Sequence, residues 1–341
     1  MKPTIGDVAA AAGVSRTSVS FAFNKPDRVA EATLERILAV ASELGYVPDP
    51  VARSMSSGRT GAIGVLVPQA LTSMVSNPLF AEFLAGVALT TESRELPILL
   101  VSPLQGSMER AVSGAAVDGF LTIGLEGFRP TVQMLDARRL PYVMVDSEPA
   151  DGVACVNPDD VGGAYLAMRA VLDAGHRRIG ILGIQSPPPH DWRNYTGTLA
   201  RRMSGYARAL AEFGIAIDDV PLVESEVSEE SGVDATRELL EQDPALTAII
   251  SMSDICALGA LEELSRRGLN VPEDVSVVGF DGIPEARWSR PALTTIAQDP
   301  IEKGRVSAAL LVGLIDGTHT AAHLVLDTTL VPGESLAPPT R

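Results

Sequence analysis

The chain has 341 residues, of which 46% are apolar, and its 27 Lys and Arg against 43 Asp and Glu give a net charge of −16. This length predicts two or three domains with sizeable cores. No run of eighteen apolar residues occurs, which excludes a long apolar membrane span.

The first two dozen residues predict two short helices joined by a tight turn. Thr4 suits an N-cap, Asp7 stands at capping-box spacing, and Gly13 suits the left-handed position after a helix. Ser15 predicts the cap of the second helix, whose polar face begins with Arg16, Thr17 and Ser20. In a helix-turn-helix, such residues meet base edges in the major groove. The pattern therefore predicts DNA binding, with an ordinary alanine-rich hairpin as the alternative.

A third amphipathic helix is predicted over residues 31–44, with Gly45 as its stop. Residues 1–60 contain seven Lys or Arg and six Asp or Glu, so the acidic excess lies in the remainder. A nearly neutral headpiece predicts weak non-specific DNA binding and specific affinity that depends on dimerisation. Arg16 can pair with O6 and N7 of guanine, the commonest specific contact.

From Thr60 onward, short apolar runs alternate with helical stretches in two series. Continuous apolar strands of this kind predict parallel sheets covered on both faces, hence two doubly wound α/β lobes. Ligands bind such sheets at the carboxyl ends of the strands. The predicted strands are 63–67, 98–101, 119–123 and 142–145, followed by 179–182, 248–250 and 275–279.

The sequence shows no enzyme chemistry. It lacks a phosphate loop, a dinucleotide fingerprint, a nucleophile elbow and a histidine pair at metal-binding spacing. We therefore expect no enzyme activity, no cofactor and no metal. Cys155 and Cys256 predict buried free thiols, and the start Met-Lys-Pro-Thr leaves no room for a signal peptide, so the expected location is the cytoplasm.

Further motifs follow one another along the chain: Leu44-Gly-Tyr-x-Pro48, Val51-Ala-Arg-Ser-Met55 before Arg59-Thr60, Gly175-His-Arg-Arg-Ile-Gly180, Arg202-Met-Ser-Gly-Tyr206, Val271-Pro-Glu-Asp-Val-Ser-Val-Val-Gly-Phe-Asp281 and Pro291-Ala-Leu-Thr-Thr-Ile296. With residues 4–20, they resemble the lactose-repressor (LacI/GalR) family of bacterial transcription regulators. They occur in the family's order and span nearly the whole chain.

The resemblance implies a helix-turn-helix domain over 1–48, a hinge helix and linker over 49–60, and a periplasmic-binding-protein-like core over 61–341. The first lobe would hold about 61–157 and 291–321, and the second about 158–290 and 322–341. It also implies a repressor that binds a pseudo-palindromic operator in double-stranded DNA as a homodimer or tetramer. A small polar effector, such as a sugar, would bind between the lobes and bias DNA binding reciprocally.

The same resemblance implies the DNA contacts, which are Thr4, Ser15, Arg16, Thr17, Ser20, Phe21, Ala52, Arg53 and Met55. The hinge helix would comprise only the seven residues 50–56, which are too few to sustain a helix alone in water. We therefore expect this segment to fold when it binds DNA. Met55 stands where the family carries a leucine that wedges into the minor groove. The alternative interpretation of the whole segment is a plain linker. Phe21 stands where many members of the family carry a polar or basic residue. It would either contact a thymine methyl group or pack within the headpiece.

The two main candidates for contact with the effector are Asp281 and Arg202. Asp281 ends a predicted strand and so faces the ligand, although it also suits a helix cap. Arg202 occupies the family's effector-arginine position, with an ambiguity of one residue because Arg201 is adjacent. The other candidates are Phe80, Ser147, Trp192, Asp254 and Gln298; Phe80 equally suits core packing, and Asp254 is more often a helix cap.

Two departures from the family pattern affect this site. Asn157-Pro158 stands where the family often has Asp-Asn at the first crossover, which would remove a carboxylate. The loop 186–195 looks long and carries Trp192, so it would serve as a lid or as a proline-stiffened surface loop. The competing reading of the whole chain is a solute-binding protein of a transport system. The N-terminal helices argue against that reading.

Overall fold

The computed structural model describes residues 3–49, 54, 58–124, 129–186 and 191–340. The chain divides into two compact units, Met1–Gly61 and Ala62–Arg341. The expected hinge contacts Ala52, Arg53 and Met55 lie outside the described residues, as do residues 187–190 of the long loop.

The first unit contains helices α1 (Ile5–Ala12), α2 (Arg16–Asn24) and α3 (Glu31–Leu44). The capping box is present, since the Thr4 side chain accepts from the Asp7 amide and the Asp7 carboxylate accepts from the Thr4 amide at 2.8 Å. Gly13 ends α1 at φ 65°, which a residue with a Cβ adopts with strain. Val8, Val19 and Ile37 pack as a fully buried core between the helices. The three predicted helices are confirmed.

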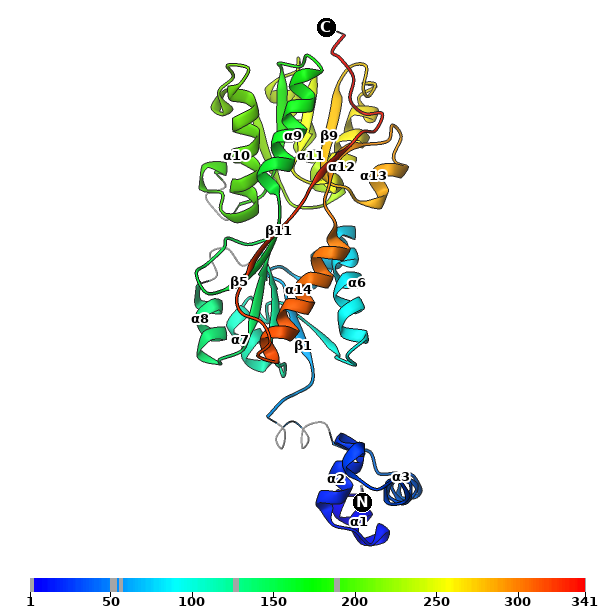
Figure 1. Cartoon of the computed structure of the whole chain (residues 1–341). Coiled ribbons are helices and arrows are strands. Elements are labelled where there is room, and N and C mark those ends of the chain that lie inside the picture. The colour runs from blue at the N-terminus through cyan, green and yellow to red at the C-terminus, as the bar shows by residue number, and fades with distance from the viewer. Residues whose placement is uncertain (1–2, 50–53, 55–57, 125–128, 187–190, 341) are drawn as a thin grey trace. The chain divides into compact units, whose positions relative to one another are not determined.

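The first lobe of the second unit is a parallel sheet in the order β11-β5-β4-β3-β1-β2. Helix α14 (Pro300–Ile315) packs against helix α6 (Pro78–Glu92), as Figure 1 shows. A Cβ on Gly86 or Gly304 would collide with the backbone of the other helix, so these glycines permit the close approach. The strands are β1 (Ile63–Leu66), β2 (Ile98–Val101), β3 (Phe120–Ile123), β4 (Tyr142–Val145), β5 (Ala154–Pro158) and β11 (His323–Leu326); the remaining helices are α5 (Leu71–Val75), α7 (Met108–Gly114) and α8 (Arg129–Ala137).

The second lobe is a sheet in the order β12-β10-β9-β8-β6-β7, in which only β12 runs antiparallel among the described strands. Its two faces are covered by different helices. Ile181 and Ile250 pack with helices α9 and α10, whereas Leu182 and Ile249 pack with α11 and α12. The strands are β6 (Ile179–Ile184), β7 (Leu222–Ser225), β8 (Ala248–Ser251), β9 (Ser276–Asp281), β10 (Thr294–Ala297) and β12 (Thr329–Val331); the helices are α9 (Asp160–Asp173), α10 (Gly197–Ala211), α11 (Glu229–Gln242), α12 (Asp254–Arg266) and α13 (Pro284–Trp288).

The doubly wound architecture is confirmed, but the expected lobe boundaries near the C-terminus are wrong. Strand β10, expected in the first lobe, pairs with β9 in the second sheet. Strand β11, expected in the second lobe, pairs with β5 in the first sheet. The chain therefore passes between the lobes after Pro158, after Ala297 and after Leu326. Strand membership depends on these distant pairings, which local apolar runs do not encode.

Candidate functional site

The second headpiece helix presents the predicted DNA-reading residues. Ser15 caps α2 by accepting from the Ser18 amide at 3.0 Å, which places the following residues on the first turn. Arg16 and Thr17 are exposed there, and Ser20 lies half-buried one turn later. Thr4 is exposed too, but its hydroxyl donates to Asp7 in the capping box.

Glycine and aromatic residues set the shape of this surface. A Cβ built on Gly6 would lie 3.0 Å from Nη2 of Arg16, so the guanidinium rests close against α1. Phe23 packs on the headpiece core and meets Tyr46 edge to face at 5.7 Å. Phe21 is half-buried and is not part of that core cluster. Phe21 therefore lies outside the described headpiece core and keeps part of its ring exposed.

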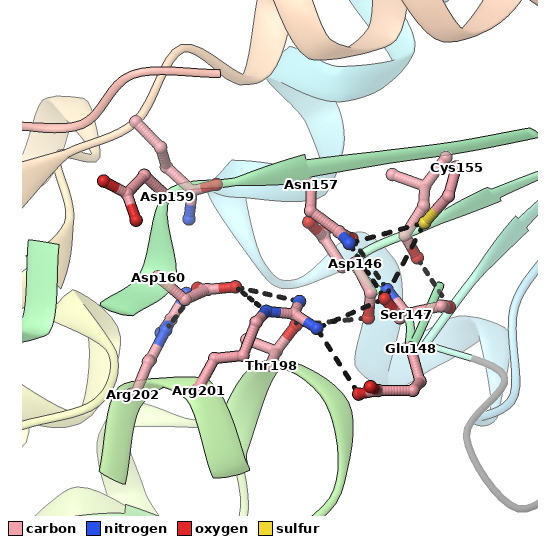
Figure 2. A network of polar contacts seen from close by, with 12 residues as sticks. Asp146, Ser147, Glu148, Cys155, Asn157, Asp159, Asp160, Thr198, Arg201 and Arg202 are labelled. Atoms are coloured by element: carbon pink, nitrogen blue, oxygen red, sulfur yellow. Dashed lines mark hydrogen bonds and ion pairs between the residues drawn. The ribbon is translucent and has the colours of Figure 1, made fainter. Parts of the chain in front are cut away.

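In the second unit, charged residues gather where strands of both lobes end. Asp281 is the last residue of β9, and Asp146 follows β4. Asp160 begins α9, where a carboxylate also favours the positive end of the helix. Arg201 and Arg202 lie on α10, directed toward Asp160, as Figure 2 shows. The strand ends and the helices α9 and α10 thus bring these charged groups into one region.

Arg202 is held entirely within the second lobe and is 4% exposed. Its Nε donates to Oδ1 of Asp160 at 3.0 Å, and Nη1 donates to the carbonyl of Met252. Nη2 lies 3.6 Å from Oδ1 of Asp281, and the guanidinium stacks 3.7 Å from the centre of the Phe280 ring. A buried cation requires such partners, because an unpaired one would be costly.

Asp281 is the acidic centre of the second lobe. Its φ of 131° is a strained backbone conformation for a residue with a side chain. Burial raises the pKa of its carboxyl, and the nearby Arg202 guanidinium works in the opposite direction. The Nε2 of Gln298 donates to Oδ1 of Asp281 at 2.8 Å. Two of the predicted effector residues, Asp281 and Gln298, are therefore in direct contact, with Arg202 beside them.

Lys303 continues this network into the first lobe. Its Nζ donates to Oε1 of Gln298 at 2.9 Å and to both carboxylate oxygens of Asp146 at 2.8 and 2.9 Å. Sequence reasoning missed both residues. Asp146 follows a predicted strand, so its position was a usable signal. Lys303 lies on α14, and its position in the sequence pattern of that helix gave no sign that its side chain is buried.

Arg201 is the second arginine at Asp160. Its Nε donates to Oδ2 of Asp160 at 3.0 Å, and its Nη1 donates to the carbonyl of Ser147 at 3.2 Å (Figure 2). Both arginines thus share one carboxylate, Arg201 through Oδ2 and Arg202 through Oδ1. Asn157 and Pro158 supply no carboxylate at the crossover, but Asp159 and Asp160 follow directly, and the buried Asp160 supplies one.

The other predicted effector residues have structural partners. Oδ2 of Asp254 accepts from the amides of Gly282 and Ile283 at 2.6 and 3.0 Å, and the N-cap of α12 is its neighbour Ser253. Phe80 is buried in the first-lobe core. The Ser147 hydroxyl donates to the carbonyl of Val145 at 3.0 Å.

Trp192 is partly buried against the second-lobe core, and the Arg193 guanidinium lies 4.6 Å from the centre of its ring. Its neighbour Tyr195 is buried and donates to the carbonyl of Ile184 at 2.7 Å. These two aromatic residues anchor the described end of the long loop to the second lobe.

Within the described residues, no cluster of three His, Cys, Asp or Glu side chains is arranged to hold a metal ion. The helices of the described chain include none that is long and apolar enough to cross a membrane. Cys155 and Cys256 are buried and form no disulfide within the described part of the chain, as predicted.

Comparison with known proteins agrees with both units. Residues 4–49 match the family described as bacterial regulatory proteins, lacI family, and residues 168–336 match a periplasmic binding protein-like domain. The transcriptional regulator IpsA of Corynebacterium glutamicum is 35% identical, covering 98% of each chain. The transcriptional repressor CytR of Escherichia coli is 32% identical, covering 94% of this chain and 92% of its own.

A solved structure described as a transcriptional regulator CelR–cellobiose complex superimposes with a TM-score of 0.73 at 33% identity. It covers 98% of this chain and all of its own. The helix-turn-helix headpiece, the two-lobed core and these full-length matches lead to one conclusion. The chain belongs to the lacI family of bacterial regulatory proteins and is a DNA-binding transcriptional regulator rather than an enzyme.

Proposed function

We propose that the protein is a cytoplasmic repressor that binds a pseudo-palindromic operator as a homodimer and responds to a small, uncharged polyol, such as a sugar. The polar network at the strand ends of both lobes carries this proposal. It offers carboxylates, guanidinium groups and a carboxamide, which together suit the paired hydroxyls of a sugar.

The charge balance of this network favours an uncharged ligand. Arg202 contacts Asp160 and Asp281, and Lys303 contacts Asp146. Each of these cations already has a carboxylate partner in a buried setting, so an anionic ligand would have to compete for it. A neutral polyol can add hydrogen bonds without breaking an ion pair.

The relatives support the proposed class of ligand and the proposed direction of regulation. CelR has been solved with cellobiose, and CytR is named a repressor. We propose Asp281, Arg202 and Gln298 as the effector contacts, with Trp192 at the edge of the site. Asp254 and Phe80 are not part of this proposal, because their side chains are committed to the fold.

The DNA-binding part of the proposal combines the headpiece with the segment 49–60. Arg16, Thr17, Ser20 and Phe21 would read the major groove of each half-site. The segment 49–60 would fold as a hinge helix on DNA, with Met55 as the minor-groove wedge. Effector binding would change the lobe arrangement and, through it, the pairing of the two hinge segments.

A gel-shift titration tests the proposal. The full-length protein is mixed with DNA from upstream of its own gene, and cellobiose and other neutral sugars are added in turn. We expect a shift that one sugar abolishes at saturating concentration. A solute-binding protein would bind the sugar without any shift, and this outcome would refute the proposal.

A further inference from the structure

Two contacts from helix α10 of the second lobe reach the first lobe at a single turn. Nη1 of Arg201 donates to the carbonyl of Ser147 at 3.2 Å. The hydroxyl of Thr198, one helical turn earlier, donates to the carbonyl of Asp146 at 3.1 Å. Both acceptors are backbone carbonyls directly after β4, which ends at Val145, and Figure 2 shows Asp146 and Ser147 beside Arg201. We propose that Arg201 is an interlobe clasp, which holds the two lobes in the arrangement seen here and sets how readily they separate.

The base of the clasp is rigid on the second lobe. Asp160 is fully buried and accepts from Nε of Arg201 with Oδ2, while its Oδ1 accepts from Arg202. Nη2 of Arg201 also lies 2.9 Å from Oδ2 of Asp160, so two nitrogens of the guanidinium contact the same carboxylate oxygen. Gly205 makes this possible, because a Cβ there would collide with the carbonyl of Val161 and push α10 away from α9.

The receiving side on the first lobe is equally fixed. Oδ1 of Asn157 accepts from the Ser147 amide at 2.9 Å, and Nδ2 of Asn157 donates to the Ser147 carbonyl at 2.9 Å. Asp146 adopts φ 52°, a left-handed conformation that turns the chain sharply after β4. Glu148 adds a carboxylate 3.9 Å from Nη1 of Arg201. The Ser147 carbonyl is therefore held in place by contacts within the first lobe, independently of Arg201.

The neighbouring arginine shows that this role is specific. Arg202 contacts Asp160, Asp281 and Met252, which all belong to the second lobe. It shapes the proposed effector site, whereas Arg201 spans the lobes. Arg201 is thus a positioning residue that would act on regulation through the lobe arrangement, and in that respect the inference rests on the proposed function.

The test measures the distance between the lobes in the full-length protein, without DNA or sugar. Spin labels are attached to Gln133→Cys on α8 and Ala211→Cys on α10, both exposed, while the native cysteines are buried. Labelled protein is diluted with excess unlabelled protein, so that distances within one chain dominate. Double electron–electron resonance then gives the distance distribution.

Arg201→Ala should raise the population at longer interlobe distances about ten-fold, as expected for loss of a charge-assisted hydrogen bond. Thr198→Val should act in the same direction with a smaller effect, and Arg201→Lys should lie between Arg201→Ala and the parent protein. The matched control is Arg208→Ala, because Arg208 lies on the same helix and stacks on Tyr165 within the second lobe.

An unchanged distance distribution in Arg201→Ala and Thr198→Val overturns the proposal. So does an equal change in Arg208→Ala, which would indicate general loosening of α10. Circular dichroism accompanies each variant, and if Arg201→Ala does not fold, Arg201→Lys and Thr198→Val decide the outcome. Because the distance measurement contains no sugar or DNA, it can refute the clasp without refuting the proposed function. The gel-shift titration can likewise refute the proposed function without refuting the clasp.

Discussion

The hydroxyl of Thr295 donates a 2.6 Å hydrogen bond to Oδ1 of Asp254. This bond ties strand β10 to the first turn of α12, deep in the second lobe. The other oxygen of Asp254 holds the loop after β9. One buried carboxylate thus joins three segments that are distant in sequence, close to Asp281.

Stability should depend on pH through Asp254. Burial, with a contribution from the nearby Asp281 charge, raises the pKa of Asp254 to about 7, against 3.8 as the ordinary value. Between these values the native state binds a proton that the unfolded state has released, so the free energy of unfolding falls as pH rises from about 4 to about 7. Urea unfolding across this range should show the decline.

The variant Asp254→Asn isolates this contribution. Its carbonyl oxygen can accept from Gly282 and Ile283, and its amide can donate to a reoriented Thr295 hydroxyl. We expect the variant to fold and to lose less stability over the same pH range. An identical slope in both proteins would contradict the raised pKa.

Arg16→Ala should strongly reduce discrimination between operator and unrelated DNA. A bidentate arginine–guanine contact contributes about 1–3 kcal/mol, which corresponds to roughly ten- to a hundred-fold in specific affinity. Fluorescence anisotropy on a pseudo-palindromic site and on a scrambled site measures the ratio. Arg36→Ala, an exposed position on α3, serves as the control for lost charge. An unchanged affinity ratio in Arg16→Ala would refute the assigned role.

Asp281→Ala should remove the effector response while DNA binding survives. The change removes the carboxylate oxygen that accepts from Nε2 of Gln298. It also removes one of the carboxylates next to Arg202. The gel shift should remain, and the sugar identified by titration should no longer reverse it. Asp281→Asn retains an acceptor for Gln298 and should keep a partial response. If Asp281→Ala responds normally, the ligand assignment fails.

Gly205→Ala should destabilise the second lobe by about 1–3 kcal/mol, because the added methyl group overlaps the Val161 carbonyl where α10 crosses α9. Urea unfolding gives the change. Gly114→Ala is the matched control, since a Cβ there meets no atom within 4 Å and the backbone is not left-handed. Equal effects of the two substitutions would show that close packing at Gly205 is unimportant.

The headpiece was predictable because its signals are local. Thr4 with Asp7 and Gly13 specify helix ends within a few residues, and the structure contains each of them. The strands β10 and β11 were assigned to the wrong lobes because their partners lie far away in sequence.

The same contrast holds for the polar site. Asp281 could be found because it follows an apolar strand. Lys303 and the pairing of two arginines with Asp160 could not, since burial and partner choice emerge only when distant segments meet.

The repeated passage of the chain between the two sheets has a consequence for assembly and for truncation. A chain cut after residue 290 would lose β10 and β12 from one sheet and β11 from the other. Neither sheet can therefore reach its final set of strands until nearly the whole chain has been synthesised. The two lobes should unfold as one cooperative unit, and C-terminal deletions should damage both at once.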